Sequence, residues 1–396
     1  MKHIKNLKIS KICSITGMGS LSSLGISDEE IINNLHSEKT FIKKIFTGDK
    51  QVWAAPLALE AQEYIFSFLS RSSKYKCLDP SVLLSMLAAE KALKQARWGA
   101  QKPIGINIGS SRGATHAFES HFSYFSKDLE GKAQILSSPT TTLGNIAYWT
   151  GQHLQSTGMA FSHSITCSSA LHALLNAVVW LHSGFCEKFI AGGAEAPLTP
   201  FTIAQMQALR IYSKKEGPYP CRAGDLKKSG NSFVLGEGAA VFALEKGVKK
   251  NALALIENIG FATETLQSHT SISEEGENLQ KSMKMALSHS SAEEVDAIVT
   301  HTPGTLKGDF AEYRAIQAVF GNSPLLITNN KWKTGHTLGA SGALSLEMAV
   351  RMLKEDIFIP LPFYGAKTYR KKMRKILVNA TGFGGNAVSI LLSKNL

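Results

Sequence analysis

The stretch 158–184, GMAFSHSITCSSALHALLNAVVWLHSG, contains the pattern from which the fold can be read. Its first part, GMAFSHSIT, has the composition of a short β-strand, and its second part places apolar residues at helical spacing. The small residues Cys167, Ser168 and Ser169 lie where the strand gives way to the helix. A strand that runs directly into a helix is one unit of an α/β fold.

The same pattern continues on both sides of this stretch. Strand-like segments that end in polar or Gly-rich turns occupy 9–25, 103–115, 188–196, 239–247, 253–262, 296–304, 325–330 and 375–385. Helical periodicity occupies 81–96, 311–321 and 341–355. The alternation predicts a layered α/β protein. The basic segment KGVKKNA, 246–252, separates two strand-like runs, and we place a boundary near 250 between an N-terminal part, 1–250, and a C-terminal part, 251–396.

Composition narrows the classes of protein. The 396 residues are 44% hydrophobic, enough for a large core, and no uncharged apolar run reaches the ~18–20 residues of a membrane span. The N-terminus lacks the apolar core of a secretory signal, so we expect a cytoplasmic protein. Five single cysteines without zinc spacing predict neither disulfides nor a structural metal. The net charge of +12 favours an acidic partner, and the absence of an aromatic and basic nucleic-acid motif favours an acidic protein.

Cys167 is the first candidate for chemistry. A thiol at a helix N-terminus lies at the positive end of the helix dipole, which stabilises the thiolate and makes the sulfur a better nucleophile. The alternative interpretation is a buried, inert cysteine that packs as a small hydrophobic residue. The local sequence does not decide between them.

Three further motifs are ambiguous when each is taken alone. In HTPGTLKGDFAE, 301–312, a strand leads to His301 in a Gly-containing turn. A histidine in such a turn is more often a hydrogen-bonded loop residue than a catalytic one. In NNKWKTGHTLGASGA, 329–343, His336 lies among glycines, five residues after Lys331, which also fits a tight helix entry. In NATGFGGNAVSI, 379–390, Phe383 stands between glycines in a turn before the last strand.

Taken together, these motifs resemble the β-ketoacyl-acyl carrier protein synthases, specifically the branch with a Cys-His-His site. The resemblance extends from SITGMGSLSSLG, 14–25, through TCSSALHAL, 166–174, and the GEG of 236–238, to the three motifs above, in the same order and spacing. It implies a thiolase-like α/β fold of two fused βαβαβαββ-type halves in a five-layered α-β-α-β-α arrangement. It also implies active sites near a dimer interface.

The resemblance assigns a role to each matching position. It makes Cys167 the acyl-carrying nucleophile, pairs His301 with His336, and adds Lys331, Asp309 and Glu312 as supporting residues. Lys331 and Glu312 are expected to form an ion pair that orients the histidines. Phe383 resembles the family's pocket gate, and its backbone N–H is expected to join that of Cys167 in an oxyanion hole.

The implied activity is an acyltransferase reaction, the decarboxylative Claisen condensation of a Cys-bound acyl chain with a malonyl group. Both groups would arrive on the phosphopantetheine of an acyl carrier protein, in fatty acid, polyketide or polyene biosynthesis. No metal or organic cofactor is required. The expected assembly is a homodimer, or a heterodimer with a homologous subunit. We expect the basic surface to dock the carrier protein through Lys214, Lys215, Lys227, Lys228 and the segment KTYRKKMRK, 367–375.

Several positions depart from the family pattern. Pro303 replaces one pantetheine-contacting threonine while Thr305 keeps the second, Thr381 replaces a phenylalanine, and Trp332 stands where a small residue is usual. A pocket with Thr381 would be roomier or more polar. These changes favour an acyl substrate other than an ordinary saturated fatty chain. The sequence as a whole resembles the synthases of pigment or aryl-polyene pathways.

Three rival functions are weighed against this one. A non-catalytic chain-length-factor subunit shares the fold but usually lacks the nucleophile, which Cys167 supplies here. A degradative thiolase needs a second catalytic cysteine, which the GHTLGASGA context lacks. A nucleic-acid-binding protein would fit the charge alone, and no motif supports it.

Overall fold

Two five-stranded sheets form the centre of the protein. The structure is a computed structural model that describes residues 12–99, 103–127, 132–265, 272–321 and 323–395. The first sheet has the order β1-β8-β6-β4-β5, in which β4, β5 and β6 are parallel and β8 is antiparallel to both neighbours. Its strands are β1 (Cys13–Ser22), β4 (Gly105–Gly109), β5 (Ala160–His163), β6 (Lys188–Glu195) and β8 (Gly238–Lys246).

The second sheet repeats this topology. Its order is β11-β10-β14-β15-β9, again with three parallel strands followed by an antiparallel one. Its strands are β9 (Ala254–Thr263), β10 (Ala297–Val299), β11 (Leu326–Thr328), β14 (Lys375–Gly382) and β15 (Asn386–Ser393). Counted along the chain, each sheet has the order third, second, fourth, fifth, first.

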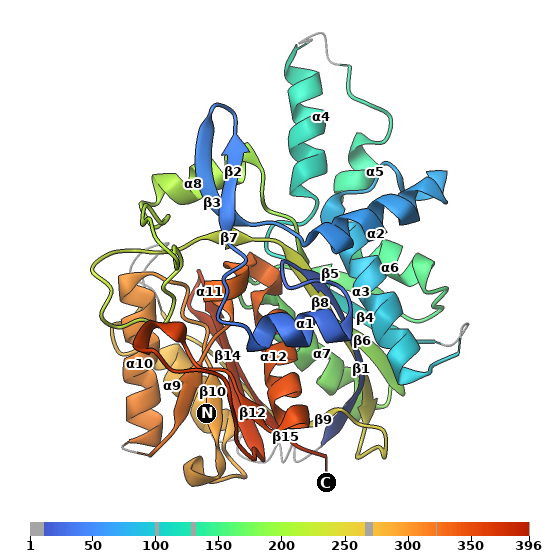
Figure 1. The fold of residues 1–396 in the computed structure, drawn as a ribbon. Coiled ribbons are helices and arrows are strands. Elements are labelled where there is room, and N and C mark those ends of the chain that lie inside the picture. The colour runs from blue at the N-terminus through green and yellow to red at the C-terminus, as the bar shows by residue number, and fades with distance from the viewer. Residues whose placement is uncertain (1–11, 100–102, 128–131, 266–271, 322, 396) are drawn as a thin grey trace.

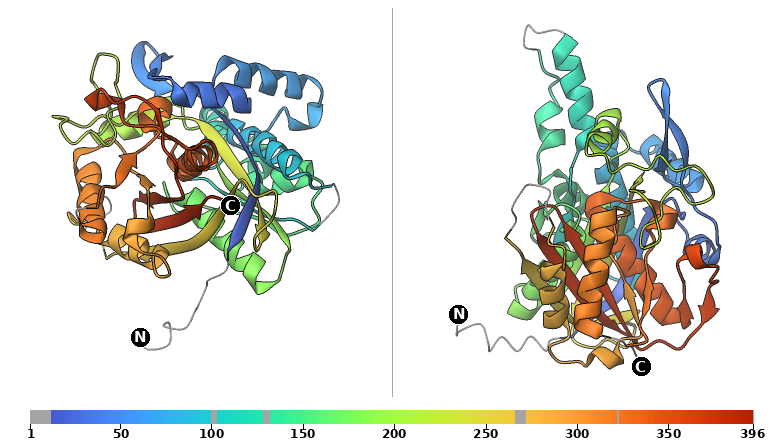
Figure 2. Two further views of the ribbon diagram at one scale, coloured as in Figure 1. Left: turned by 60° about the horizontal axis from the view of Figure 1, so that its bottom comes forward. Right: turned by 90° about the vertical axis from the view of Figure 1, so that its left-hand side faces the viewer.

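Helices complete five layers (Figures 1 and 2). Helices α3 (Pro80–Ala96) and α6 (Asn145–His153) cover the outer face of the first sheet, and α9 (Glu277–Ala286) and α10 (Leu306–Phe320) cover that of the second. Between the sheets lie α7 (Ser169–Ser183) and α12 (Ser341–Glu355), whose apolar residues join one core cluster with strands of both sheets. All but the last two residues of α12 are buried, as expected for a helix enclosed between two sheets. The five-layered thiolase-like arrangement is confirmed.

Most of the predicted elements are confirmed within the described residues. Each segment predicted as a strand contains one, although 9–11 of the first segment lie outside the described ranges. Each predicted helix is also present, and α10 begins earlier than its periodicity indicated, at Leu306.

Two projections were not predicted from the sequence. One is the hairpin of β2 (Lys43–Thr47) and β3 (Lys50–Ala55), in which β3 pairs with β7 (Leu235–Gly236). The other is the helix α4 (Thr115–Lys127), and both extend from the same end of the molecule (Figure 1). The remaining elements are α1 (Asp28–His36), α2 (Leu59–Ser70), α5 (Ser137–Thr141), α8 (Pro200–Ala208), α11 (Lys331–Thr334), β12 (Ile357–Phe358), β13 (Tyr369–Arg370) and four short 3-10 turns, at Ser73–Tyr75, Ala292–Glu294, Leu338–Ala340 and Pro362–Tyr364.

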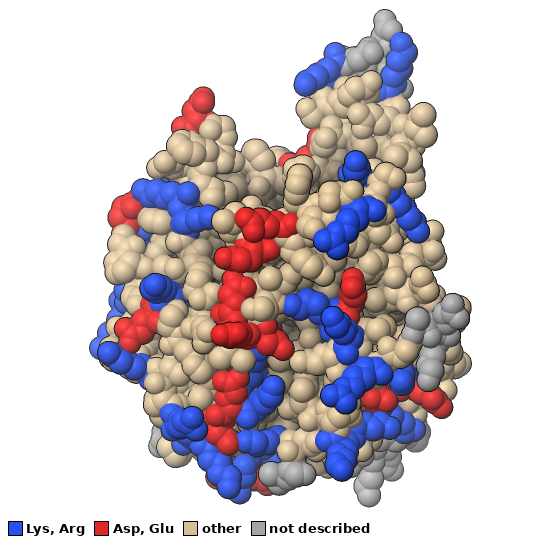
Figure 3. Space-filling view, turned by 45° about the vertical axis from the view of Figure 1, so that its right-hand side comes forward, with Lys and Arg blue, Asp and Glu red and all other residues tan. Residues whose placement is uncertain are grey.

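Charge is mixed over the surface. On the face shown in Figure 3, basic side chains are interspersed with acidic ones, and a band of acidic side chains runs down the middle. The net charge of +12 therefore does not form one continuous basic surface on this face.

Among the helices described, none is long and apolar enough to cross a membrane.

Candidate active site

Cys167 lies at a strained turn between β5 and α7. The preceding residue, Thr166, has a positive φ of 47°, which is uncommon for a residue with a side chain and reverses the chain before the helix begins. Ser168 is the N-cap of α7, so Cys167 stands one residue before the cap. The predicted location of Cys167 at a helix start is confirmed.

The Gly-rich turn after β14 packs directly against this turn. The Thr166 hydroxyl donates a hydrogen bond to the Phe383 carbonyl at 3.0 Å. A Cβ atom added to Gly382 would lie 2.1 Å from Thr166 Oγ1 and 2.8 Å from the backbone nitrogen of Cys167, so only glycine fits there. This contact brings the backbone of Phe383 beside that of Cys167, although the two segments are more than 200 residues apart in the sequence. The Phe383 side chain is 43% exposed.

His301 and His336 face each other at the ends of two other segments. Their ring centroids are 5.3 Å apart and their planes are inclined by 80°. His301 follows β10, and His336 follows α11. The His336 backbone N–H donates to the Val234 carbonyl, and its carbonyl accepts the N–H of Gly236 in β7. Both rings are buried, which lowers the pKa of each well below the ordinary value, and the nearby Lys331 lowers both further. Both rings are therefore neutral near pH 7.

The tautomer of His336 is set by one hydrogen bond. Its Nδ1 accepts the backbone N–H of Leu338 at 3.0 Å. Leu338 itself has a positive φ of 42°, a rare conformation for leucine that turns its N–H back toward the ring. Because a neutral imidazole carries one proton, Nε2 of His336 is the donor.

Glu312 and Asp309 hold the loop that carries His301. Glu312 accepts the backbone N–H groups of His301 at 2.9 Å and Thr302 at 2.6 Å, together with the Asn379 amide at 3.1 Å. Asp309 accepts the backbone N–H of Gly304 and forms a buried ion pair with Lys228. The expected ion pair between Lys331 and Glu312 is wrong: Glu312 is occupied by backbone and amide donors.

Lys331 is the electrostatic neighbour that the site residues share. Its ammonium group is buried without a hydrogen-bond partner in the described structure, and burial lowers its pKa to about 8, against the opposing effect of Glu312. The same cation lowers the pKa of Cys167 and of both histidines. Lys331 thus acts on the nucleophile and on the histidine pair together.

Burial dominates the acidity of Cys167, which the local sequence left open. Burial raises the pKa of the thiol to about 12, and the neighbouring carboxylate of Glu195 raises it further, while Lys331 lowers it. The helix start was expected to favour the thiolate, but desolvation outweighs that effect where Cys167 packs against the apolar cluster that contains Ile203 and Met206. The thiol of the resting protein is protonated.

Glu195 is a site residue that the sequence analysis missed. It ends β6 and is fully buried, and its carboxylate accepts the N–H groups of Ser111, Arg112 and Gly339 at 2.7 to 3.0 Å, as well as the Ser110 hydroxyl at 2.9 Å. Burial raises its pKa to about 7. Its only signal in the sequence was a charged residue at the end of the buried run KFIAGGAE.

The remaining predicted residues occupy different positions. Thr305 caps the N-terminus of α10 by accepting the Gly308 N–H, so its backbone and side chain border the His301 loop. The Thr381 hydroxyl bonds to Asn278 of α9 and to the Asn386 carbonyl, within the outer layers. Trp332, which stands where a small residue is usual in the family, is buried and makes a T-shaped ring contact with Tyr219.

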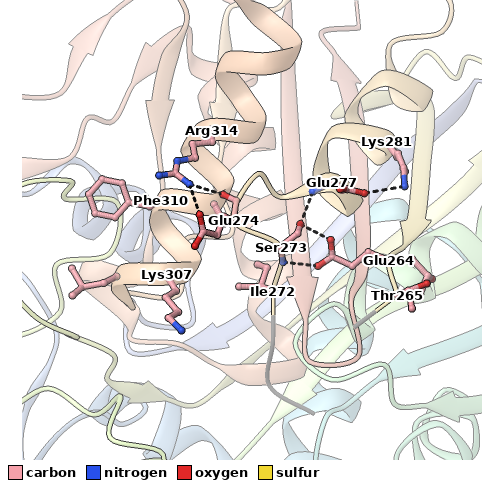
Figure 4. Close-up of a pocket in the computed structure, with 13 residues that line it drawn as sticks. Glu264, Thr265, Ile272, Ser273, Glu274, Glu277, Lys281, Lys307, Phe310 and Arg314 are labelled. Carbon is pink, nitrogen blue, oxygen red and sulfur yellow. Dashed lines mark hydrogen bonds and ion pairs between the residues drawn. The ribbon is translucent and has the colours of Figure 1, made fainter. Parts of the chain in front are cut away.

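A hollow of about 870 Å³ opens between the end of β9, α9 and α10 (Figure 4). Its lining includes Thr263 to Thr265 at the end of β9 and Leu306, Lys307 and Phe310 of α10. The Glu264 N–H donates to the Gly385 carbonyl at 3.0 Å, which joins the hollow to the turn that holds Phe383. Arg314 and Lys281 are paired with glutamates, whereas Lys307 stands apart from them (Figure 4).

Family comparison agrees with this geometry. Residues 11–249 match the N-terminal domain of the β-ketoacyl synthases, and residues 253–363 match their C-terminal domain. The chain belongs to the β-ketoacyl synthase family. It is therefore a condensing acyltransferase.

The residues described include no group of three or more His, Cys, Asp or Glu side chains placed to hold a metal ion.

The alignments with individual relatives cover almost the whole chain. The 3-oxoacyl-acyl-carrier-protein synthase 2 of Coxiella burnetii is 26% identical, over 96% of this chain and 98% of its own length. Two solved structures share the fold. One shows a type II polyketide acyl-carrier protein with its ketosynthase bound to a hexaketide, with a TM-score of 0.83, 19% identity and coverage of 97% and 100%. The other is the ishigamide ketosynthase/chain length factor, with a TM-score of 0.85, 19% identity and coverage of 97% and 99%.

The protonated state of Cys167 predicts its reactivity. We expect alkylation of Cys167 by iodoacetamide to keep accelerating between pH 7 and pH 10, whereas a free cysteine with a pKa of about 8.5 levels off within that range. Lys331→Met, which removes the cation that lowers the thiol pKa, should slow alkylation at every pH. Peptide mass spectrometry measures the rate, with Cys167→Ser identifying the labelled peptide. A plateau below pH 8 in the wild-type synthase would show that the site stabilises the thiolate.

Proposed function

We propose that this synthase joins an acyl group held on Cys167 to a two-carbon unit from a malonyl group, both delivered on acyl carrier protein. The observation that carries the proposal is the convergence of a strained thiol turn, a Gly-rich backbone turn and two neutral histidines. These parts come from both halves of the fold and meet beside one buried cation, Lys331.

In the first step Cys167 accepts the acyl group. Its sulfur attacks the carbonyl carbon of the incoming thioester, the thiol proton passes to the departing pantetheine sulfur, and the new acyl–sulfur bond replaces the old one. The transient oxyanion is stabilised by the backbone N–H groups of Cys167 and Phe383, which the contact between Gly382 and Cys167 supports. Since the resting thiol is protonated, proton transfer accompanies the attack.

In the second step the malonyl group loses carbon dioxide. The electrons of the broken carbon–carbon bond form an enolate, whose oxygen accepts hydrogen bonds from His336 Nε2 and from His301. The two neutral histidines, with the donor of His336 fixed at Nε2, suit this charge, which develops as carbon dioxide leaves. The carbanion attacks the Cys167 thioester, and the sulfur leaves and regains a proton. The product is a β-ketoacyl chain two carbons longer, still attached to the carrier.

The two steps can be tested separately. His301→Ala and His336→Ala should still allow acylation of Cys167 but should slow carbon dioxide release from malonyl carrier by about 100-fold or more, the usual effect of losing one oxyanion donor. Cys167→Ala should abolish acylation, while Cys186→Ala should leave it unchanged as the matched control. Intact-protein mass spectrometry follows acylation, and a radiometric assay follows carbon dioxide. Unchanged release in both histidine variants would refute the role of the pair.

A homologous subunit or second copy is the proposed partner along β5 and α4. β5 is an edge strand of the first sheet, and the neighbouring α4 and α5 region exposes large apolar side chains, including Phe118 at 59%, Phe122 at 61% and Leu143 at 83%. Apolar groups at this density on one projection indicate a covered surface. We expect sedimentation at micromolar concentration to show a dimer that Phe122→Glu dissociates. A monomeric wild-type protein, alone and with its homologues, would contradict this.

Docking of the carrier is proposed at the hollow beside α10 rather than at all the predicted lysines. Lys228 is buried in its ion pair with Asp309 and does not offer a surface charge. The segment 367–375 ends in Lys375, which pairs with Glu257 and Glu294 at the end of β14 opposite to Gly382. Lys307 is exposed at the hollow, and Lys214, Lys215 and Lys227 remain exposed candidates.

Charge reversal separates docking from catalysis. Lys307→Glu should weaken the reaction of acyl carrier several-fold, and raising salt from ~0.05 to 0.5 M should do the same to the wild type, because screening shortens the range of the attraction. Acyl groups on free pantetheine should respond to neither change. Lys354→Glu, at the far end of α12, is the matched control. Equal losses for carrier-bound and free substrates would show that Lys307 supports the pocket instead.

A further inference from the structure

The end of the molecule opposite the active site is built from segments that are far apart in the sequence. Gly382 of β14 contacts the Cys167 turn, and Lys375 lies at the other end of this eight-residue strand, roughly 25 Å away. β8 runs in the opposite direction, from its pairing with Glu195 to Lys246. The turn before β14 and the turn after β8 therefore both lie at this distal end, at the bottom of Figure 1.

Hydrogen bonds join the two turns through the residues that follow β15. The Lys394 N–H donates to the Arg374 carbonyl at 2.9 Å, and the Asn395 side chain donates to the Lys249 carbonyl at 3.2 Å. The two turns are thus neighbours in one surface. We call this surface, which consists of residues 246–250 and 369–374, the basic end.

The basic end carries cations that the protein does not neutralise. The nearest acidic groups are occupied, since Asp356 pairs with Lys394 at 2.6 Å. Lys375 holds Glu257 and Glu294 at 2.9 and 2.7 Å. Six other basic residues form no ion pair with a described carboxylate: Lys246, Lys249, Lys250, Lys371, Lys372 and Arg374. In Figure 3 basic side chains gather along the lower edge, which is this end of the molecule. Like charges held together repel one another, and an anionic partner would relieve this repulsion.

Each basic turn also exposes one apolar or aromatic side chain. Val248, between Lys246 and Lys249, is 60% exposed, and Tyr369, beside Arg370, is 45% exposed. A nucleic-acid backbone offers charge but no apolar phase for these side chains. A bilayer offers both, because cations meet its anionic headgroups while apolar side chains enter the boundary of the acyl chains. The combination of charges and apolar groups therefore favours a lipid surface.

The acyl carrier is not the partner that fits this surface. Its pantetheine has to reach Cys167, at the other end of the strands. The hollow proposed for its docking also lies there, where Thr263 pairs with Asn386 beside the Gly-rich turn. A partner bound at the basic end therefore leaves that hollow open.

We propose that the basic end binds an anionic lipid surface, with Val248 and Tyr369 in contact with the lipid and the basic side chains beside the headgroups. The active-site end then faces away from the bilayer and remains open to the carrier. This inference goes beyond the condensation reaction and does not depend on it.

Vesicle binding tests the inference directly. The full-length protein is sedimented with vesicles of phosphatidylcholine alone, or of phosphatidylcholine and anionic phosphatidylglycerol in equal amounts. It should bind the anionic vesicles at least about tenfold more tightly than the neutral ones. Raising salt from ~0.1 to 0.5 M should release it, because screening shortens the range of the attraction.

Variants locate the contact. Lys246→Glu, Lys250→Glu and Lys372→Glu combined should weaken binding to the anionic vesicles about 100-fold or more, since each basic residue near such a surface contributes a factor of about five. Val248→Ser should weaken it several-fold without changing its dependence on salt. The matched control combines Lys43→Glu, Lys50→Glu and Lys76→Glu, which change the net charge equally but lie outside the basic end, and it should bind nearly as the wild type does.

Each other outcome overturns the inference. The wild type would then fail to bind anionic vesicles, or the two triple variants would lose binding equally. Binding of a DNA duplex that depends on the three lysines but not on Val248, without vesicle binding, would identify a nucleic-acid surface instead. Loss of carrier-dependent turnover in the basic-end variant, with turnover of free pantetheine substrates retained, would identify a carrier-docking surface. Vesicle sedimentation needs no catalytic activity, so failure of the proposed reaction would leave its result unaffected.

Discussion

The buried carboxylate of Glu195 is the contact on which the geometry of the site depends. It stands at the end of β6 and accepts N–H groups from the turn after β4 and from Gly339, which follows His336. One side chain therefore fixes the first half of the fold against the loop that carries a histidine of the second half. A buried carboxylate is stable only when such donors surround it. The same bonds hold the backbone of Arg112, so the turn after β4 and the His336 loop share one support.

Burial, rather than charge, sets the resting state of the site. It raises the pKa of the Cys167 thiol and lowers that of His301 and His336, so nucleophile and histidines are all neutral, and Lys331 is the cation among them. A neutral thiol and two neutral imidazoles form no ion pair with one another. They remain free to respond to charge that appears on the substrate, which is what condensation requires.

The sequence predicted the strands of the two central sheets, the helices α3, α7, α10 and α12, and the motifs, because these depend on local pattern. It placed Cys167 correctly between strand and helix, and resemblance supplied its histidine partners. It failed where the answer depends on which distant groups meet. Glu312 was paired with Lys331, although backbone N–H groups of the His301 loop occupy it, and Glu195 looked like the end of an ordinary buried strand. The acidity of the thiol could not be decided from the sequence either, because a helix start is visible there and desolvation is not.

The two sheets have the same strand order, yet they contribute different chemistry. In the first half, Cys167 follows the third strand, β5, and the fourth strand, β6, ends in Glu195. In the second half, His336 comes after the third strand, β11, and the fourth strand, β14, runs into the Gly-rich turn. Neither half holds a working set alone. Catalytic turnover therefore requires that both halves are folded and packed against each other. A chain in which only one half has folded is inactive, so the specific activity of a preparation measures the fraction of completely folded molecules.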